Sequence, residues 1–322
     1  MKTLLIVNPI SGTSNKTDIV DHLLRRLSAL GVQADVRYTT CRGNATQLAQ
    51  RAIDGGYEAV VTVGGDGTIN ETAAALSGSD VTLGIIPAGS GNGLARHLGI
   101  PVDVDGAIDV IMQNHRVTID YGTMNGLPFF CTFGIGFDAA VSHRFARQRR
   151  RGPLSYIKSA IDEFVQFHPS TYTISANGKV LTEKAFLVAC CNTSQYGNNA
   201  YIAPEASITD GLLDFTIVHA GNPISTAFVG VDLFTGFINR NTLIQTFKAP
   251  SAVIYSSCPS EAHIDGEPIV AAEAMEVKCH RCQLRVFTPV QTETFRPLLT
   301  PMNNLVRDTG IAIRNAFRIK KS

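Results

Sequence analysis

The sequence has no apolar run long enough to cross a bilayer and almost no net charge. A membrane-spanning helix needs about 20 consecutive apolar residues, and the 322-residue chain has no such run. Its 28 Lys and Arg and 27 Asp and Glu leave a net charge of +1, so no basic field indicates nucleic-acid binding. The apolar stretch 4–7 ends at Asn8-Pro9 and is too short for a signal-peptide core.

The sequence also lacks a disulfide framework. Its seven cysteines are odd in number and scattered, and Cys190 and Cys191 are adjacent in an apolar run. We therefore expect a reducing, cytoplasmic environment. Charged residues make up 17%, hydrophobic residues 44%, and 28 residues are glycine, which is typical of a globular, glycine-rich enzyme with helices and strands. A chain of this length indicates two domains.

Residues 1–120 alternate between short apolar runs and helical patterns, which predicts an α/β domain with a parallel sheet. A strand at 4–7, a helix at 16–30 and a strand at 32–38 form the first βαβ unit. Further elements are expected at 44–54 (helix), 59–63 (strand), 69–76 (helix), 81–87 (strand), 94–98 (helix) and 104–114 (helix).

Residues 121–294 change to strand-like alternation, which predicts a mostly antiparallel β-sandwich domain. Asn177-Gly178 between 171–176 and 179–191 is a hairpin signal with a type I′ turn. Other strands are expected at 213–218, 252–256, 262–264, 275–279 and 283–288, with one helical stretch at 155–167. Residues 303–322 have helical spacing, and we expect residues 295–322 to return to the first domain; a helix lying on a membrane is the alternative.

Two glycine-rich segments, 64–68 and 88–93, each follow a predicted strand and lead into a helix. Such a helix start presents backbone N–H groups to a phosphate. Both loops would lie at the carboxyl edge of the parallel sheet, where ligands of open α/β folds bind. Asp66 in the first loop indicates a cation, because a carboxylate beside phosphates is otherwise repulsive. Alternatively, the glycines form tight turns and Asp66 or Thr68 caps a helix.

Neither loop matches the common nucleotide motifs. The chain has no GxxxxGK[ST] sequence, which argues against a P-loop enzyme. The glycines at 89, 91 and 93 also differ from the dinucleotide fingerprint, whose third glycine comes one position later.

The two loops, with Asn70-Glu71 and Ala95-Arg96, resemble the diacylglycerol kinase catalytic domain family, which includes bacterial lipid kinases and sphingosine and ceramide kinases. The first loop alone also resembles NAD kinases. The resemblance implies an NAD kinase/diacylglycerol kinase-like α/β fold that binds ATP and Mg²⁺, with Thr40 near the adenine or ribose; without the resemblance Thr40 is a strand-end threonine. The implied nucleotide-site residues are Asn8, Pro9, Ser11, Gly12, Thr40, Gly64, Gly65, Asp66, Gly67, Thr68, Asn70, Glu71, Gly89, Ser90, Gly91 and Asn92.

Two acidic loops lie in the second domain. From the residues alone, Asp265-Gly266-Glu267 is the tip of a hairpin. The resemblance implies instead that this segment faces the acceptor hydroxyl across the cleft. Phosphoryl transfer to an alcohol needs a group that orients or deprotonates the hydroxyl. Asp265 or Glu267 is therefore the candidate base, with Asp66 holding the catalytic Mg²⁺ network; some relatives use the aspartate equivalent to Asp66 as the base.

The second acidic loop carries Asp210 and Asp214 around a glycine turn. The residues alone favour a simple turn before a strand. The loop also resembles a structural Mg²⁺ loop of bacterial diacylglycerol kinases, which implies Asp210 and the carbonyls of Ser207 and Leu212 as ligands.

Three other features leave alternatives open. The basic cluster at 144–152 is either a solvated loop or a contact with an anionic membrane surface. Cys279 and Cys282 have metal-like spacing but no second pair, which favours a turn. Gly93 stands where many bacterial diacylglycerol kinases carry Asp, and this segment is closer to that of sphingosine kinases.

These features predict an ATP-dependent lipid kinase that phosphorylates diacylglycerol, with a sphingoid base, ceramide or another lipid alcohol as alternative acceptors. We expect a cytoplasmic protein at the inner face of the membrane, with a lipid substrate, no nucleic-acid partner and a possible homodimer. A soluble NAD kinase-like enzyme and a non-catalytic lipid or nucleotide binder are the other hypotheses.

Overall fold

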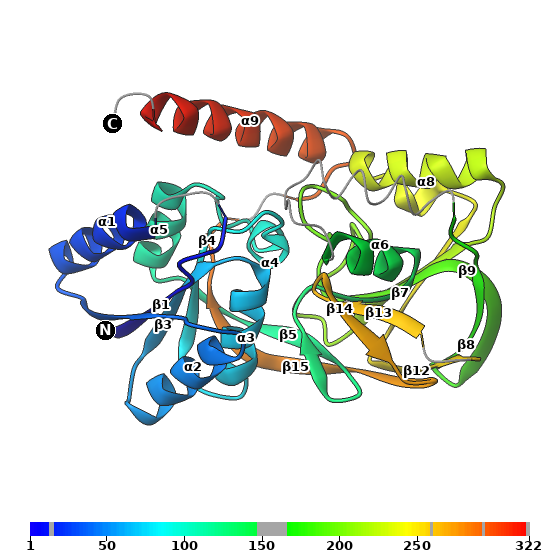
Figure 1. Ribbon diagram of the computed structural model, residues 1–322, viewed down its shortest axis with the longest axis horizontal. Helices are drawn as coiled ribbons and strands as arrows, with labels where there is room; N and C mark the ends of the chain where they lie inside the picture. Colours follow the sequence, from blue (N-terminus) through cyan, green and yellow to red (C-terminus); the bar gives the residue numbers. More distant parts are fainter. Residues whose placement is uncertain (13–15, 147–165, 258–259, 292–293, 320–322) are drawn as a thin grey trace.

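The computed structural model describes residues 1–12, 16–146, 166–257, 260–291 and 294–319. Two lobes lie side by side, an N-terminal lobe of helices around a parallel sheet and a β-rich C-terminal lobe (Figure 1). Most of the predicted helix at 155–167 and of the basic cluster at 144–152 lies outside the described residues.

The N-terminal lobe has the predicted order of elements. They are β1 (Lys2–Val7), α1 (Lys16–Ala29), β2 (Gln33–Tyr38), α2 (Asn44–Asp54), β3 (Ala59–Gly64), α3 (Asp66–Leu76), β4 (Thr82–Pro87), α4 (Gly93–His97) and α5 (Val104–Gln113). The strands pair in parallel in the order β2-β1-β3-β4. Every residue of β3 and β4 is buried, as expected where helices cover both faces of a parallel sheet.

The register of this sheet brings three loops to one edge. Val7 pairs with Val63, and Gly64 pairs with Pro87, so β1, β3 and β4 end at the same level. The chain leaves these three strands through residues 8–12, 65–68 and 88–92. The predicted nucleotide loops therefore lie next to one another at the carboxyl edge of the sheet.

The C-terminal lobe is mostly antiparallel, as predicted. Asn177 and Gly178 both have positive φ, of 51° and 72°, which confirms the hairpin turn. The strands are β5 (Arg116–Met124), β6 (Leu127–Phe129), β7 (Thr132–Gly136), β8 (Ser170–Ala176), β9 (Lys179–Cys191), β10 (Leu213–His219), β11 (Ile244–Ala249), β12 (Ser251–Ser256), β13 (Ser260–Ile264), β14 (Glu267–Ala271) and β15 (Ala274–Phe287).

Strand β15 joins the lobes into one hydrogen-bonded sheet. It pairs antiparallel with β12 and β5 in the C-terminal lobe, and Val286 pairs in parallel with Leu83 of β4. The two strands predicted at 275–279 and 283–288 are thus one strand. Its register shifts between His280 and Leu284, where Cys282 has a φ of +51°, so the turn predicted at 279–282 is an irregularity within one strand.

Strand-like alternation does not extend over the whole C-terminal lobe, because the structure has helices at α6 (Phe137–Ala146) and α8 (Pro223–Thr235), and a 3₁₀ turn, η1 (Ile238–Arg240). Helix α8 has the start and stop signals of a helix: Asn222 caps its first turn and Gly236 ends it with a φ of +78°. Its exposed face is as apolar as its buried face, so the polar-apolar period that reveals a helix is missing.

Helix α9 (Leu299–Ile319) contacts both lobes. Asp308 forms an ion pair with Arg96 of α4 at 2.8 Å, and Asn304 Nδ2 donates to Tyr201 Oη at 2.9 Å. The assignment of residues 295–322 to the first domain stays a prediction. Among the described residues, no helix has the length and apolarity needed to span a membrane.

The Phe129 ring packs directly over Gly122, so adding a methyl group at position 122 should destabilise the fold. A Cβ at Gly122 would lie 2.0 Å from Phe129 Cζ, so Gly122→Ala should lower the free energy of unfolding by about 1–3 kcal/mol. Gly230→Ala is the control, because a Cβ there meets no atom within 4 Å and the helical glycine is unfavourable; it should add about 0.5–1 kcal/mol. Urea denaturation measures both, and equal midpoints would contradict the packing.

Candidate active site

The two glycine loops press against each other without intervening side chains. A Cβ at Gly89 would lie 2.6 Å from Gly65 Cα, and one at Gly64 would lie 2.9 Å from Thr68 Cβ. Real Cβ atoms do not approach so closely, and the nearest atom to Gly89 belongs to the backbone, which cannot move aside. The contact between the loops therefore requires glycine at position 89, and it brings the backbones of Gly65 and Gly89 together.

Asp66 ties the first loop to the second. Its Oδ2 accepts the Asn92 N–H at 2.9 Å, and its Oδ1 accepts the Gly93 N–H at 2.8 Å, at the start of α4. Burial raises the pKa of Asp66, these two donors oppose the shift, and the charge of Asp265 adds to it. The carboxylate thus bonds the start of α4, which belongs to the other loop, whereas its own helix α3 follows Gly65 and has no side-chain cap.

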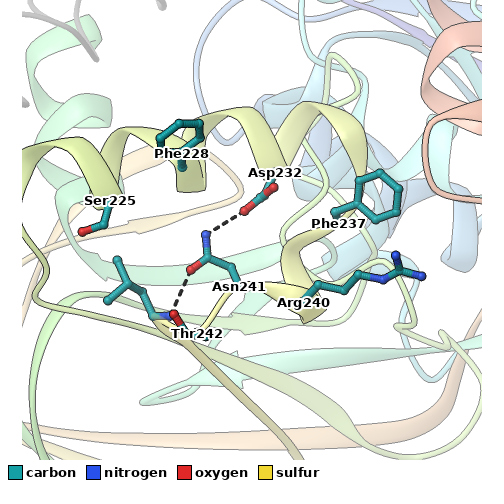
Figure 2. A pocket seen from close by; sticks show the side chains of 8 residues that line it. Ser225, Phe228, Asp232, Phe237, Arg240, Asn241 and Thr242 are labelled. Atoms are coloured by element: carbon teal, nitrogen blue, oxygen red, sulfur yellow. Dashed lines mark hydrogen bonds between the residues drawn. The ribbon is translucent and has the colours of Figure 1, made fainter.

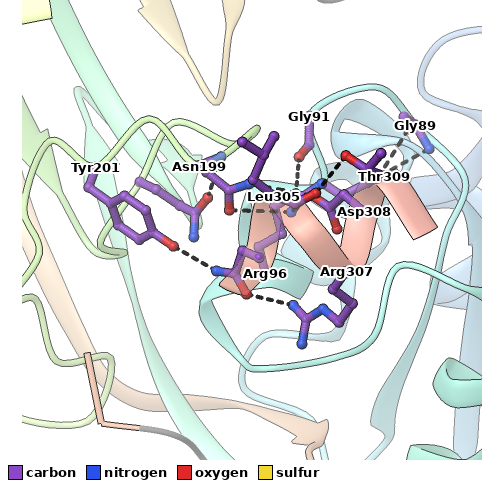
Figure 3. A network of polar contacts seen from close by, with 12 residues as sticks. Gly89, Gly91, Arg96, Asn199, Tyr201, Leu305, Arg307, Asp308 and Thr309 are labelled. Atoms are coloured by element: carbon purple, nitrogen blue, oxygen red, sulfur yellow. Dashed lines mark hydrogen bonds and ion pairs between the residues drawn. The ribbon is translucent and has the colours of Figure 1, made fainter. Parts of the chain in front are cut away.

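The second loop is further held by Asn92 and Arg96. Asn92 has a φ of 53°, and its side chain accepts from Gly89 N at 3.0 Å and donates to Gly89 O at 3.1 Å, which closes the turn. Arg96 Nε donates to Gly91 O at 3.2 Å, while its Nη1 pairs with Asp308 of α9 (Figure 3). The α9 helix is thereby coupled to the loop through a single guanidinium.

The loop after β1 completes the edge. Asn8 Nδ2 donates to Thr68 Oγ1 at 2.9 Å, and its Oδ1 accepts the Ile10 N–H at 3.1 Å. Gly12 has a φ of +59°, and a Cβ there would lie 2.3 Å from Ala88 O, so this loop lies against the second glycine loop as well. The solvent-accessible rim of the edge includes Pro9, Ser11 and Ser90.

Two residues of the predicted nucleotide site make contacts that organise α2. Glu71 Oε1 accepts the Gly43 N–H at 2.8 Å and its Oε2 accepts the Ala45 N–H at 3.2 Å, at the start of the helix. Thr40 N donates to Asn44 Oδ1 at 3.1 Å. Both carboxylate oxygens of Glu71 therefore neutralise a helix N-terminus, and its part in nucleotide binding stays a prediction.

Asp265 crosses from the C-terminal lobe to α3. It lies in the two-residue turn between β13 and β14 with a φ of 48°. Its four carboxylate contacts are Phe130 N (2.9 Å), Cys131 N (2.8 Å), Thr132 N (2.9 Å) and Asn70 Nδ2 (2.8 Å). Burial raises the pKa of Asp265, and these four donors counteract it. Because every donor stabilises the ionised form, this carboxylate is a fixed anchor.

Glu267 follows Asp265 by two residues and is far less constrained. About half of its side chain is exposed, and its Oε2 lies 4.0 Å from Nη1 of the exposed Arg42. Its Oε1 lies 3.7 Å from the place a Cβ on Gly67 would occupy. The second predicted carboxylate therefore faces the first glycine loop across the two lobes.

A buried polar trio behind this turn was not predicted. His263 Nε2 lies 3.1 Å from Asp138 Oδ2, which also accepts the Tyr196 hydroxyl at 2.8 Å. Gly266 N donates to His263 Nδ1 at 3.4 Å, which assigns the proton to Nε2. His263 lies on β13, two residues before the turn, but no local pattern links it to Asp138, which is 125 positions away in the sequence.

Gly93 is covered by a segment of the C-terminal lobe. A Cβ there would lie 3.2 Å from Cys131 Sγ and 3.3 Å from Tyr196 O. Asn198 N donates to Gly91 O at 3.3 Å, and Gly197 has a φ of +116°. A side chain as long as aspartate at position 93 would displace this segment, so the glycine matches its surroundings here.

The second acidic loop directly precedes β10, and Lys248 of the neighbouring strand β11 contacts it. Asp210 Oδ1 accepts the Leu212 N–H at 3.0 Å, and its Oδ2 lies 3.0 Å from Lys248 Nζ. In the parts of the chain that the structure describes, no three His, Cys, Asp or Glu side chains gather as metal ligands. The metal role of Ser207, Asp210 and Leu212 needs one carboxylate and two backbone carbonyls, so this finding does not test it and it stays a prediction.

Comparison with known proteins agrees with this geometry. Residues 2–124 match the model of the diacylglycerol kinase catalytic domain, and residues 132–288 match that of the YegS C-terminal NAD kinase beta sandwich-like domain. A diacylglycerol kinase of Bacillus subtilis is 29% identical over 269 residues, 82% of this chain and 88% of that protein.

A diacylglycerol kinase of Mycobacterium tuberculosis is 28% identical over 275 residues, 83% of this chain and 88% of its own. The crystal structure of a putative diacylglycerol kinase from Bacillus anthracis superposes with a TM-score of 0.75 over 90% of this chain and 97% of that one, at 24% identity, which supports the fold. With both domain models matched in the expected order, the chain belongs to the diacylglycerol kinase catalytic domain family.

Proposed function

We propose that the chain is an ATP-dependent kinase that transfers the γ-phosphate to the hydroxyl of a membrane lipid such as diacylglycerol. The observation that carries the proposal is the approach of Glu267, from the C-terminal lobe, to the first glycine loop at Gly67. The names of the relatives supply the substrate class. A protein with this activity would work at the cytoplasmic face of a membrane without spanning it.

The nucleotide would lie along the edge formed by residues 8–12, 64–68 and 88–92. The start of α3 carries no side-chain cap, whereas the start of α4 is already capped by Asp66. The phosphates are therefore expected at α3 and along the exposed rim. Each Asp66 oxygen accepts one N–H and keeps a lone pair, so this carboxylate fits a role in holding Mg²⁺, which would screen the phosphate charges.

The transfer step assigns different work to the two carboxylates of the β13–β14 turn. The lipid hydroxyl oxygen bonds to the γ-phosphorus, the bond from that phosphorus to the β–γ bridging oxygen breaks, and ADP leaves. The hydroxyl proton passes to Glu267, whose oxygens have no backbone donors among the described contacts. Asp265 holds the turn, because its oxygens are occupied by four donors.

The test of this function is a transfer assay with γ-labelled ATP and Mg²⁺. Mixed micelles would present diacylglycerol, sphingosine, ceramide or phosphatidylglycerol, and a parallel reaction would contain NAD. We expect label in diacylglycerol. Label only in another lipid would change the acceptor, formation of NADP would indicate a soluble kinase, and ATP binding without any transfer would indicate a non-catalytic protein.

The roles of the two carboxylates can be separated by substitution. Glu267→Gln should lower kcat by about 10²–10⁴-fold, the usual contribution of a general base, with no change in melting temperature, because the side chain is half exposed. Asp265→Asn should lower both the rate and the melting temperature, since an amide cannot accept all four of its hydrogen bonds.

The comparison uses steady-state kinetics and thermal unfolding on the same preparations. A Glu267→Gln protein with wild-type kcat would contradict the assignment of the base. So would an Asp265→Asn protein that melts like the wild type and yet transfers no phosphate.

A further inference from the structure

More than half of the exposed large apolar side chains in the described residues lie on α8, on the first half of α9 and at Leu298 directly before α9. Steps of three or four residues, with the adjacent pairs 298–299 and 305–306, place them on one side of each helix. We call this set the apolar helix face: Ile224, Phe228, Val231, Phe234, Leu298, Leu299, Met302, Leu305 and Val306. Contiguous exposed patches of this kind mark interaction sites, whereas isolated apolar residues do not.

The end of α8 and the start of α9 are joined directly. Leu298 N donates to Thr235 O at 2.8 Å, so the start of α9 is bonded to the last turn of α8. A Cβ at Gly236 would lie 2.5 Å from Phe295 Cζ, which shows how closely the two ends pack. Both helices lie along the same side of the molecule, across the top of both lobes (Figure 1).

The acidic groups of α8 and α9 are already paired within the protein. A hollow of about 380 Å³ beside α8 is lined by Phe228, Asp232 and Asn241 among others (Figure 2). Asn241 Nδ2 donates to Asp232 Oδ2 at 2.6 Å, and Asp308 of α9 pairs with Arg96. The acidic groups of the two helices are therefore compensated or hydrogen-bonded internally.

Three exposed arginines beside the apolar helix face form no ion pair with any residue that the structure describes. Arg240 lies over the Phe237 ring at 4.9 Å, and Arg296 and Arg307 are exposed at the start and middle of α9. An apolar face bordered by basic residues is complementary to an anionic bilayer, in which apolar side chains enter the acyl boundary and cations meet the headgroups.

We propose that the apolar helix face docks this protein on the surface of an anionic lipid bilayer. The inference rests on the proposed function, since a kinase for a lipid hydroxyl must reach a substrate that stays in the membrane. It names a different element from the basic cluster at 144–152. The apolar helix face belongs to two helices from distant parts of the sequence, which are hydrogen-bonded to each other at Thr235 and Leu298.

Vesicle binding tests the proposal without ATP. Co-sedimentation should show the full chain bound to phosphatidylcholine vesicles that contain phosphatidylglycerol, and more weakly bound to phosphatidylcholine alone. The double variant Phe228→Ser, Leu305→Ser should bind at least about tenfold more weakly, since two apolar side chains leave the interface. The control Leu30→Ser, Val180→Ser removes two equally exposed apolar side chains elsewhere and should bind like the wild type.

Wild-type binding by the double variant would overturn the proposal. A fall in its sedimentation mass, with vesicle binding retained, would do the same and would assign the face to a contact between copies of the chain. A dispersed short-chain diacylglycerol separates the two proposals: the double variant should phosphorylate it at the wild-type rate. If the wild type phosphorylates no lipid at all, the function fails while the vesicle result still stands.

A second inference comes from Lys248, which is independent of the membrane face. Strands β10 and β11 pair Asp214 with Lys248. The Lys248 Nζ lies 3.0 Å from Asp210 Oδ2, 3.2 Å from Asp214 Oδ2 and 3.3 Å from Glu205 O. Burial lowers the pKa of Lys248, but the hydrogen bonds and charges of the two aspartates outweigh it and raise the pKa.

These surroundings do not fit the divalent cation that the family resemblance implies for this loop. A cation on Asp210 would meet an ammonium at hydrogen-bond distance from the same carboxylate. We propose that the Lys248 ammonium takes the place of the divalent cation, so the loop at 207–212 is held without a metal. Asp120 supports the same loop, since its Oδ2 accepts the Gly211 N–H at 2.6 Å and its Oδ1 accepts the Cys282 N–H at 2.7 Å.

Thermal unfolding without nucleotide, in EDTA and in Mg²⁺, tests this substitution. The wild type should melt at one temperature in both and carry no divalent metal by elemental analysis. Lys248→Ala should melt several degrees lower in EDTA and recover in Mg²⁺, because the two carboxylates then attract an added cation. The control Lys184→Ala, on the exposed face of β9, should respond to neither.

A wild type that carries one tightly bound divalent ion and melts earlier in EDTA would overturn this second proposal. A Lys248→Ala protein whose melting temperature is the same in EDTA and in Mg²⁺ would overturn it too.

Discussion

The geometry of the candidate site depends on the buried carboxylate of Asp265. A buried carboxylate without partners would cost several kcal/mol, and here its four donors come from both lobes. Three are backbone N–H groups at the start of β7, and the fourth is Asn70 of α3. Because α3 begins at Asp66, the turn that contains Asp265 is placed in register with the first glycine loop. Glu267 reaches Gly67 as a consequence of that register.

Around the glycine loops, too, charged side chains bind backbone groups of the protein itself. Asp66 caps α4, Glu71 caps α2, and Arg96 bonds the carbonyl of Gly91. Each of these groups satisfies N–H or C=O groups that a tight loop or a helix end would otherwise leave without partners. The capacity to bind an anion is then concentrated where no side chain intervenes, at the start of α3.

Much of the N-terminal lobe could be predicted, because its signals are local. The apolar strands and the glycine loops each occupy a few consecutive residues, and parallel topology brings the strand ends together. The roles of Asp265 and Glu267 could not be separated in this way, since the deciding bond joins Asn70 to a residue 195 positions away. Helix α8 was missed for a different reason. It is apolar on its exposed face as well, so its sequence lacks the alternation of polar and apolar residues that predicts an amphipathic helix.

The lobes are held at separate points, and this limits how far the site can open. Strand β15 pairs with β4 on one side and with β5 and β12 on the other, while the Arg96–Asp308 pair holds α9 to the second loop. A hinge motion large enough to part Glu267 from Gly67 would break the Asp265–Asn70 bond and disturb the pairing of β15 as well. Under the proposed function, the acceptor is therefore brought to a site that is already assembled, which agrees with the proposed contact of the apolar helix face with a bilayer.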